Sequence, residues 1–436
     1  MKKQVDYDSR FQEEWYKMLR WAKNSGVQFL LLCFLVFMSG CGLNTHVVDT
    51  SATSSPVIIS EPDHATIISV AATDDVAYLA ESDRSLTARQ ANNGQVVWRQ
   101  TGLAFLPKQY VWLVPTPKML FDAYDSTPTT AFVEARQINT GRVLWRRAIP
   151  HELGPGFVAV MVDVNRVYVN TVFPLNQGLL YALDADNGQV RWQYAFQGQP
   201  MDTSVYSSNG VVAIRDRASN GSAHVIHGTD GSLLLSYTCP AGTNWRPAID
   251  SSNVYVYCPG HFLQAYRISD GKLVWTAQNS SLQVNYWIEN QGVLYSNTGD
   301  ELQAFRAQDG TLLWKTTLPG GTLGPSVQNQ LVGMMTASQV VMVFHAKDGT
   351  LAWKRPLNSS VLYTDIDADG FFLFGNDQAI DVWRSSDGRD ILHTTTSSRI
   401  VWQPQVVNAH LYLWQFNGAL EVVDLRIGNV LWQYVL

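Results

Sequence analysis

Three carboxylates spaced two residues apart are a candidate for metal chemistry in this chain. Asp365, Asp367 and Asp369 precede Gly370 and match the opening of a twelve-residue calcium loop, D-x-D-x-D-G. Such a loop needs a bidentate carboxylate at its twelfth position, where this chain has Asn376. In the repeat described below, the same segment falls on a turn between two strands. We therefore predict a hairpin turn here, with calcium binding as the alternative.

The histidines and cysteines do not form a zinc pattern. His224 and His227 lie three residues apart on a predicted strand, so their side chains point to opposite faces. No two cysteines of the folded part form a C-x-x-C pair. Phosphate loops, serine-hydrolase elbows and dinucleotide fingerprints are not found in a fitting context either. Nothing in the sequence indicates a metal site or an enzyme.

The elements that position these residues come from nine copies of one short phrase. Each copy has an apolar start, a few mixed residues, usually Asp, Asn or Thr before Gly, then three residues and usually Trp. The glycines recur every 39 to 47 residues: Gly94, Gly141, Gly188, Gly231, Gly271, Gly310, Gly349, Gly388 and Gly428. Seven copies keep the tryptophan: Trp98, Trp145, Trp192, Trp275, Trp314, Trp353 and Trp432. A fixed period of this length indicates a repeat architecture.

One period has room for four short strands and their turns. Residues 280–318 illustrate it, because β-rich runs alternate with turn residues and no helical period interrupts them. The Asp-Gly or Asn-Gly pair before the last strand is a tight turn signal, since glycine accepts a positive φ. A single four-stranded unit cannot bury both faces, so the units must stack, and closing them into a ring removes the exposed ends. We predict an all-β fold, a β-propeller of four-stranded antiparallel blades.

The repeated phrase resembles the repeat of the pyrroloquinoline-quinone (PQQ)-like β-propeller superfamily, A-x-D-x-x-T-G-x-x-x-W. The resemblance covers roughly residues 62–436. It implies eight blades, yet plausible first and second strands precede all nine copies, including 64–81 before the first. Eight blades with a degenerate or shared unit and a literal nine both remain open.

The same resemblance implies a specific enzymatic alternative, namely a PQQ-dependent dehydrogenase or a degenerate relative of one. In those enzymes PQQ is stacked on a Trp, and Glu, Asn and Asp hold calcium beside a catalytic Asp. This chain has no Cys-Cys dipeptide and no long inserted loops, and none of those residues can be matched to it. We therefore expect no catalytic residue and no cofactor, with PQQ and calcium as the alternative.

The N-terminus resembles a bacterial lipoprotein signal. About twelve nearly unbroken apolar residues, 27–38, follow Arg20 and Lys23 and precede Ser39, Gly40 and Cys41. We expect residues 1–41 to act as a signal with lipidation at Cys41, and Met18 is a candidate for the true start. The alternative is an uncleaved membrane anchor. Both place the propeller outside the cytoplasm, in a bacterial cell envelope.

A tether and a candidate disulfide follow from the remaining sequence. Residues 42–61 are rich in Ser and Thr without helical period, which predicts a flexible tether, and 62–436 form the propeller. Cys239 lies where the fourth unit meets the fifth, and Cys258 ends the second strand of the fifth unit. Both positions fall on the same face of the ring, which permits a disulfide; the alternative is two buried thiols.

A candidate binding surface lies at the mouth of the central channel, where the innermost strands begin. Equivalent positions in the nine units carry different residue types, whereas positions with a purely structural role should carry similar residues in every unit. The mixed aromatic and polar candidates are Tyr110, Asp202, Trp245, Arg246, Asn285 and Trp402. They would suit contacts with peptides or sugars. The alternative is that these side chains only plug the channel.

Composition restricts the partners. The formal net charge of −6 and the absence of a basic stripe argue against nucleic acid. The anchor, tether and repeat together resemble the lipoprotein propellers of the outer-membrane β-barrel assembly machinery, which is a likeness at the level of the fold. We expect a membrane-tethered, non-enzymatic scaffold that binds envelope proteins or peptides. A carbohydrate- or peptide-binding surface lipoprotein is a further alternative.

Overall fold

The fold is all-β in every part of the chain that the computed structural model describes. The described residues are 56–59, 65–106, 110–151, 159–173, 177–197, 205–215, 222–238, 247–258, 262–278, 286–297, 300–319, 322–328, 330–336, 338–357, 363–366, 370–375, 378–400 and 404–435. They lie in the unit Ser54–Leu436. Among them, no helix is long and apolar enough to cross a membrane. The anchor and Cys41 fall outside the described residues.

The described strands form nine sheets, each built on a meander of four consecutive antiparallel strands, and one sheet has a fifth strand described below. Blades 1 to 3 are β2 (Ile67–Ala72), β3 (Val76–Glu81), β4 (Ser85–Gln90) and β5 (Val96–Gln100); β6 (Trp112–Pro115), β7 (Met119–Thr127), β8 (Thr130–Gln137) and β9 (Val143–Pro150); β10 (Ala159–Asp163), β11 (Arg166–Phe173), β12 (Gln177–Asp184) and β13 (Val190–Gln197). Blades 4 to 6 are β14 (Val205–Ser208), β15 (Val211–Arg215), β16 (Ser222–His227) and β17 (Leu233–Thr238); β18 (Ala248–Ile249), β19 (Asn253–Cys258), β20 (Phe262–Arg267) and β21 (Leu273–Gln278); β22 (Tyr286–Asn290), β23 (Val293–Asn297), β24 (Glu301–Arg306) and β25 (Leu312–Thr317). Blades 7 to 9 are β26 (Thr322–Gln328), β27 (Leu331–Thr336), β28 (Val340–His345) and β29 (Leu351–Pro356); β30 (Tyr363–Ile366), β31 (Phe371–Gly375), β32 (Ala379–Arg384) and β33 (Asp390–Thr395); β34 (Gln405–Val407), β35 (His410–Trp414), β36 (Leu420–Asp424) and β37 (Asn429–Tyr434).

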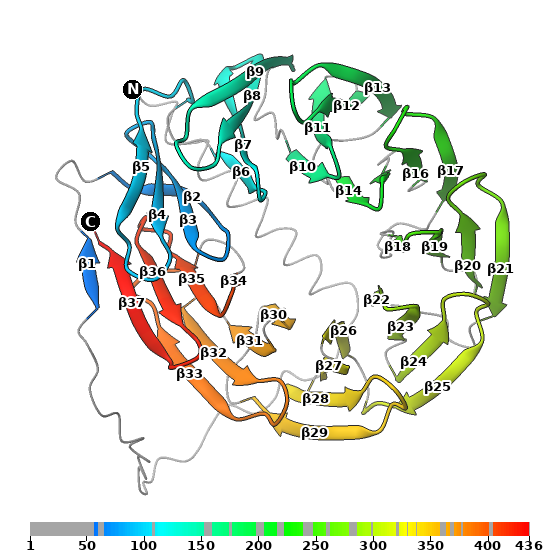
Figure 1. Cartoon of the computed structure of the whole chain (residues 1–436). Coiled ribbons are helices and arrows are strands. Elements are labelled where there is room, and N and C mark those ends of the chain that lie inside the picture. Colours follow the sequence, from blue (N-terminus) through cyan, green and yellow to red (C-terminus); the bar gives the residue numbers. More distant parts are fainter. Residues whose placement is uncertain are drawn as a thin grey trace, which may run out of the picture. The chain divides into compact units, whose positions relative to one another are not determined.

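The blades surround a central axis in chain order, and blade 9 lies beside blade 1 (Figure 1). The predicted propeller is confirmed, and of the two blade numbers left open it is nine that the structure has. The first strand of each blade lies toward the middle of the ring and the fourth strand lies outside, as β22 and β25 illustrate (Figure 1). β30 and β31 pair across the Asp365–Gly370 segment, as the hairpin interpretation requires, although residues 367–369 lie outside the described part.

The turn before each outer strand explains the repeated Asx-Gly pair. In blade 1 the Gly94 N–H donates to the Gln90 carbonyl at 2.9 Å, and the Gln90 N–H donates to the Gln95 carbonyl at 2.8 Å. The Asn93 side chain accepts the Gln95 N–H at 2.9 Å, which is the local bond that favours Asn and Asp in turns. Gly94 has φ 70°, a conformation that glycine adopts without steric cost.

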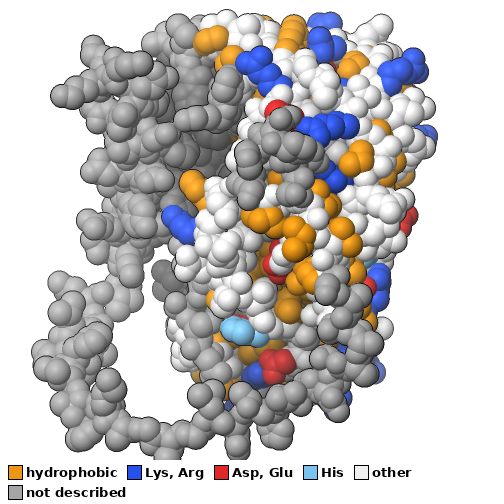
Figure 2. Space-filling view, turned by 90° about the vertical axis from the view of Figure 1, so that its left-hand side faces the viewer, with side chains coloured by type: hydrophobic (Ala, Val, Ile, Leu, Met, Phe, Trp, Pro, Cys, Tyr) orange, Lys and Arg blue, Asp and Glu red, His pale blue; other side chains and the backbone are white. Residues whose placement is uncertain are grey.

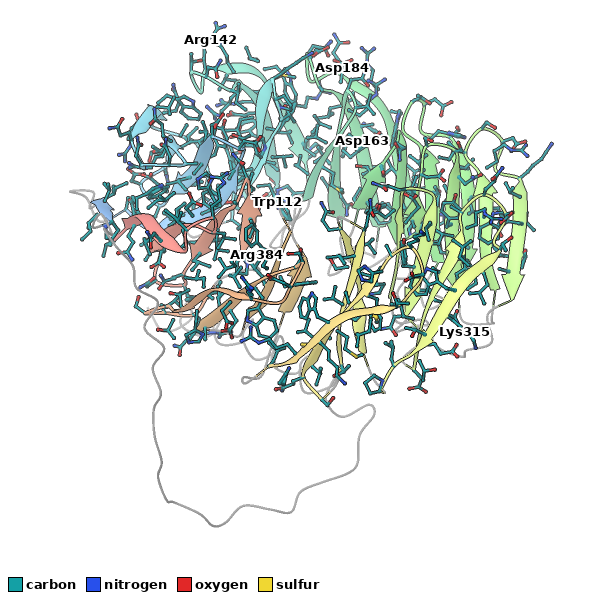
Figure 3. All side chains as sticks on the ribbon, turned by 60° about the horizontal axis from the view of Figure 1, so that its bottom comes forward. Trp112, Arg142, Asp163, Asp184, Lys315 and Arg384 are labelled. Carbon is teal, nitrogen blue, oxygen red and sulfur yellow. The ribbon has the colours of Figure 1, made fainter. Side chains whose placement is uncertain are left out.

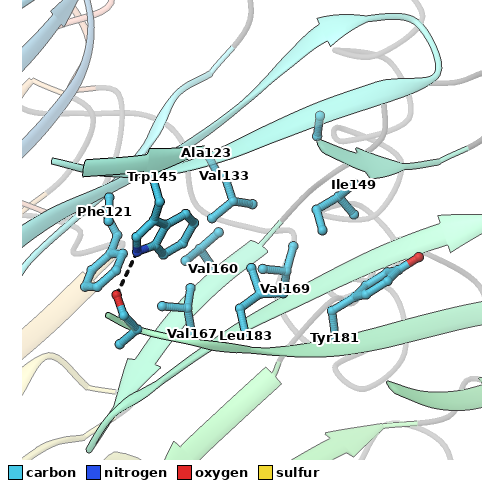
Figure 4. Packing of buried hydrophobic residues seen from close by; sticks show 13 residues of the cluster. Phe121, Ala123, Val133, Trp145, Ile149, Val160, Val167, Val169, Tyr181 and Leu183 are labelled. Atoms are coloured by element: carbon cyan, nitrogen blue, oxygen red, sulfur yellow. Dashed lines mark hydrogen bonds between the residues drawn. The ribbon is translucent and has the colours of Figure 1, made fainter. Parts of the chain in front are cut away.

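Every interface between neighbouring blades has its own apolar core, so the ring needs no single large core. Figure 4 shows the core between blades 2 and 3, where Trp145 packs beside Phe121, Val160 and Val167. The Trp145 indole N–H donates to the Ala185 carbonyl of the next blade at 2.8 Å. The other six repeat tryptophans make the same bond to the next blade, at 2.8 to 3.0 Å: Trp98, Trp192, Trp275, Trp314, Trp353 and Trp432. Each of these rings therefore links its blade to the next one.

One strand lies in the segment for which the sequence predicts a tether. β1 (Val57–Ile59) pairs in parallel with β37 and makes blade 9 a five-stranded sheet. Figure 1 shows β1 alongside β37 at the outer side of the ring. β-branched aliphatic residues favour extended backbone, and the outer edge of β37 supplies the hydrogen-bonding partner. Residues 42–61 therefore include a strand that pairs with the ring.

Candidate functional site

Tyr110, one of the predicted mouth residues, lies on the face of the ring that we call the connection face. This face carries the links between blades and the turns between second and third strands, as the Leu103 N–H shows by donating to Arg84 O at 3.0 Å. Of the six predicted residues, the structure describes only Tyr110, two residues before β6. The other five lie outside the described residues: Asp202, Trp245, Arg246, Asn285 and Trp402. The disulfide also stays a prediction, because Cys239 and the Cys258 side chain are outside them too.

Tyr110 belongs to an aromatic group formed with Trp112 and Trp414, which is the last residue of β35. The Tyr110 ring lies edge-on to Trp112 with centroids 5.2 Å apart and is tilted toward Trp414 at 6.3 Å. Trp112 starts β6, an innermost strand, and lies toward the middle of the ring, whereas Lys315 lies at its outer side (Figure 3). Residues from blades 2 and 9 thus meet beside blade 1.

The surrounding backbone holds this aromatic group in place. The Trp414 indole N–H donates to the Ile67 carbonyl at the start of β2, 3.0 Å away. Burial raises the pKa of Tyr110 and the Ser69 hydroxyl only partly opposes that shift, so the phenol stays neutral and can donate a hydrogen bond. All three rings are half-buried, and Phe416 in the adjacent turn is 65% exposed. Such rings offer apolar area at low entropic cost, which suits recognition of a partner.

A second set of polar residues is buried between blades 1 and 2. We call Asp122, Glu134 and Arg136, with Arg146 at their edge, the buried charged group. The Arg136 Nε donates to the Asp122 carboxylate at 2.9 Å, and both guanidinium groups pair with Glu134. The Tyr124 hydroxyl donates to Glu134 Oε1 at 3.0 Å. The first three side chains are at most 2% exposed, so no substrate reaches them and their role is structural.

The electrostatics of this group follow from its burial. Loss of hydration raises the pKa of Asp122 to about 7, although Arg136 opposes the shift. Burial alone would lower the pKa of Arg136, but Asp122 and Glu134 raise it, so the guanidinium stays charged. Loss of hydration and the adjacent carboxylates also raise the pKa of Tyr124, which remains a hydrogen-bond donor.

Sequence reasoning missed the buried charged group, although the repeat carries a signal for it. The residue after the alanine of the repeated phrase is Arg89 in unit 1 and Arg136 in unit 2, whereas equivalent residues such as Leu183 and Phe305 are apolar. A charge at a position that is elsewhere apolar predicts a buried partner. In blade 1 that arginine bonds Gly94 O and lies 5.8 Å from the Tyr434 ring.

The described residues bear on calcium but not on the quinone, so PQQ with calcium stays the alternative. They contain no group of three or more His, Cys, Asp or Glu that could hold a metal ion.

Comparisons with known proteins agree with the fold. The model of one family, described as outer membrane protein assembly factor BamB, matches residues 130–278 and 287–362, more than half of the chain. No curated protein matches the sequence. Among solved structures, BamB from Moraxella catarrhalis is 14% identical, with 73% of this chain and 92% of that chain covered and a TM-score of 0.43.

Two further solved structures have similar scores. The computationally designed Ika8 protein is 15% identical over 78% of this chain and 99% of that chain, with a TM-score of 0.45. Quinohemoprotein alcohol dehydrogenase from Comamonas testosteroni is 12% identical, with 78% of this chain and 77% of that chain covered and a TM-score of 0.43. Such low scores say nothing about chemistry, so the family match carries the assignment. That match shows that this chain belongs to the family of the outer membrane protein assembly factor BamB.

Proposed function

We propose that this chain is a membrane-tethered β-propeller that works outside the bacterial cytoplasm as a non-enzymatic binding and scaffold protein. The observation that carries the proposal is the family match over more than half of the chain. The family is named for outer membrane protein assembly, so the proposed partners are other envelope proteins or their peptide segments.

The proposed anchor is a lipid on Cys41. An apolar run of about twelve residues with positive residues before it and Ser39-Gly40-Cys41 after it supports cleavage and lipidation. We expect a Cys41→Ser chain to lose radiolabelled fatty acid and to leave the membrane fraction. Cys33→Ser, inside the apolar run, is the matched control and should keep both. An unlabelled wild-type chain would exclude the lipid anchor.

The proposed binding surface is the aromatic group with the exposed Phe416. Half-buried aromatic rings beside a polar rim are the usual anchors of protein interfaces. We expect the full chain, extracted from its native membranes in mild detergent, to co-purify with envelope proteins. Trp112→Ala with Phe416→Ala should lose them, whereas Leu313→Ala on the outer rim should not.

Two results would contradict this function. One is a double variant that retains every partner while its melting temperature matches wild type. The other is turnover of an alcohol or an aldose after the chain is mixed with PQQ and calcium, because the scaffold needs no catalysis. Phe416→Ala alone separates partner loss from misfolding, since Phe416 is 65% exposed and contributes little to the core.

A further inference from the structure

The fifth strand of blade 9 shows how an outer edge of this ring can be covered. β1 runs parallel to β37 with Val57, Ile58 and Ile59 opposite Trp432, Gln433 and Tyr434. The Val435 N–H donates to the Ile59 carbonyl at 2.9 Å. The Ile59 side chain and the Trp432 ring both pack against Gly94, where an added Cβ would lie 2.5 Å from Ile59 Cδ1 and 2.9 Å from Trp432 Cδ2.

Covering this edge completes the burial of a repeat tryptophan. Trp432, under β1, is 0% exposed, whereas Trp98, Trp145 and Trp192 are 8 to 9% exposed. Trp275, Trp314 and Trp353 are only half-buried. In the described part of the chain, β1 is the one strand added outside a fourth strand. Apolar side chains are visible on the outer wall among scattered charged residues (Figure 2).

Charge separates the nine outer strands into two classes. Exposed edges of sheets are commonly protected by charged side chains, above all lysine, which block the addition of another strand. Six outer strands carry such residues: β5 with Arg99, β9 with Arg146 and Arg147, β13 with Arg191, β25 with Lys315, β29 with Lys354 and Arg355, and β33 with Asp390. The strands β17, β21 and β37 carry none. Of these three, β37 is the strand that β1 covers.

β21 repeats the geometry of β37 most closely. Both place two aliphatic residues before the tryptophan, and β17 lacks that ring because it has Leu235 there. The Trp275 indole N–H donates to Ala307 O at 3.0 Å, as that of Trp432 does to Ala91 O at 2.8 Å. A Cβ on Gly310 would meet Trp275 at 2.6 Å, so Gly310 holds the place that Gly94 holds at β37. Leu273 is 51% and Val274 39% exposed.

We propose that the outer edge of β21 is a docking site for an extended, uncharged segment of β-branched aliphatic residues from another protein. The segment adds in parallel, as β1 does on β37, and its third residue packs beside Trp275 and Gly310, as Ile59 does beside Trp432 and Gly94. Backbone hydrogen bonds hold the strand, and the apolar side chains select its composition. This surface is separate from the aromatic group and extends the proposed scaffold function to a second site.

The test uses the full chain and a labelled synthetic peptide of residues 54–62, SSPVIISEP, followed by fluorescence anisotropy. We expect saturable binding. Thr276→Lys places a lysine where Lys315 stands in blade 6, and it should weaken binding at least about tenfold without lowering the melting temperature. Thr317→Lys adds the same charge to the already charged β25 and should leave binding unchanged. The peptide SSPDIDSEP should not bind.

Photo-crosslinking locates the peptide independently of any variant. A photoreactive residue in place of the central isoleucine should label residues 273–278, whereas labelling confined to β37 or to the connection face would overturn the proposal. Equal weakening by Thr276→Lys and Thr317→Lys would also overturn it. So would a dimer that Thr276→Lys abolishes in light scattering, because a second copy would then occupy the edge. Since this assay needs neither membrane nor native partner, its failure leaves the partner co-purification above unaffected.

Discussion

The Trp432 indole in the last blade donates its N–H to the carbonyl oxygen of Ala91 in the first, 2.8 Å away across 341 residues of sequence. The same bond joins consecutive blades elsewhere, so the seam of the ring is built like the other interfaces that keep the tryptophan. Closure therefore needs no separate device, and β1 adds to it from outside.

Removing the Trp432 indole should destabilise the closure of the propeller between blades 9 and 1. Trp432→Ala deletes a side chain that is 0% exposed, so we expect unfolding to become easier by about 3–5 kcal/mol. Trp432→Phe keeps most of the apolar area and loses the bond to Ala91, so it should cost less. The midpoint of urea unfolding measures both. A urea midpoint of Trp432→Ala equal to that of wild type would mean that Trp432 does not stabilise the closed propeller.

The turn glycine at the seam should tolerate no side chain. Gly94 has φ 70°, and an added Cβ would lie 2.5 Å from Ile59 Cδ1 and 2.9 Å from Trp432 Cδ2. Gly292 has φ 79° with nothing within 4 Å, so it is the matched control. Alanine costs about 1–2 kcal/mol at either position through backbone strain, and about 1–3 kcal/mol more at Gly94 through overlap. Equal thermal shifts for the two variants would argue against the close packing of β1.

The buried charged group should make stability depend on pH. The pKa of Asp122 is about 7 in the folded protein, against an ordinary 3.8. Between those values the folded chain keeps a proton that the unfolded chain releases, so the free energy of unfolding rises as pH falls from 8 toward 5. Burial also raises the pKa values of Glu81 and Glu421, which act in the same direction.

Asp122→Asn isolates one carboxyl from the others. We expect this variant to gain less stability than wild type on acidification, by at least about 1 kcal/mol between pH 8 and pH 5. Urea unfolding at a series of pH values measures the difference. Parallel pH profiles for wild type and Asp122→Asn would show that the Asp122 carboxyl has the same pKa in the folded and the unfolded chain, which would contradict the prediction.

The arginine of this group should be replaceable only together with its partner. Arg136→Leu leaves the Asp122 and Glu134 carboxylates short of a cation, which should cost about 3–5 kcal/mol. Asp122→Val with Arg136→Leu imitates blade 3, where the buried residues Val169 and Leu183 occupy these places. The double variant should recover part of the loss, because no carboxylate at position 122 is left without a cation and Glu134 keeps Arg146 and Tyr124 as partners. A double variant less stable than Arg136→Leu would show that the charges themselves are needed.

Most of the fold could be predicted from the sequence because each copy carries its own turn and wedge. Gly94 and Trp98 define one unit, and eight further units follow at similar spacing. β1 could not be predicted in this way. Val57, Ile58 and Ile59 lie in a Ser/Thr-rich segment with no period, and their partner strand begins at Asn429, far away in sequence.

The candidate site was predictable only in part. Tyr110 could be predicted as a candidate because the residue type at its position differs among the copies. The structure places it with Trp112 and Trp414. Trp414 was missed because it ends a second strand, while the alignment followed only the starts of innermost strands. Its contact with Tyr110 depends on ring closure, which brings blade 9 beside blades 1 and 2.

Site-specific photo-crosslinking in living cells tests the central claim most directly, namely that the connection face binds an envelope protein. A photoreactive amino acid at position 416, where Phe416 is exposed, should yield an adduct with an envelope protein. The same residue at position 92, an exposed site in the turn on the opposite face, should not. Adducts of equal yield from both positions, or none from position 416 in a folded chain, would contradict the account.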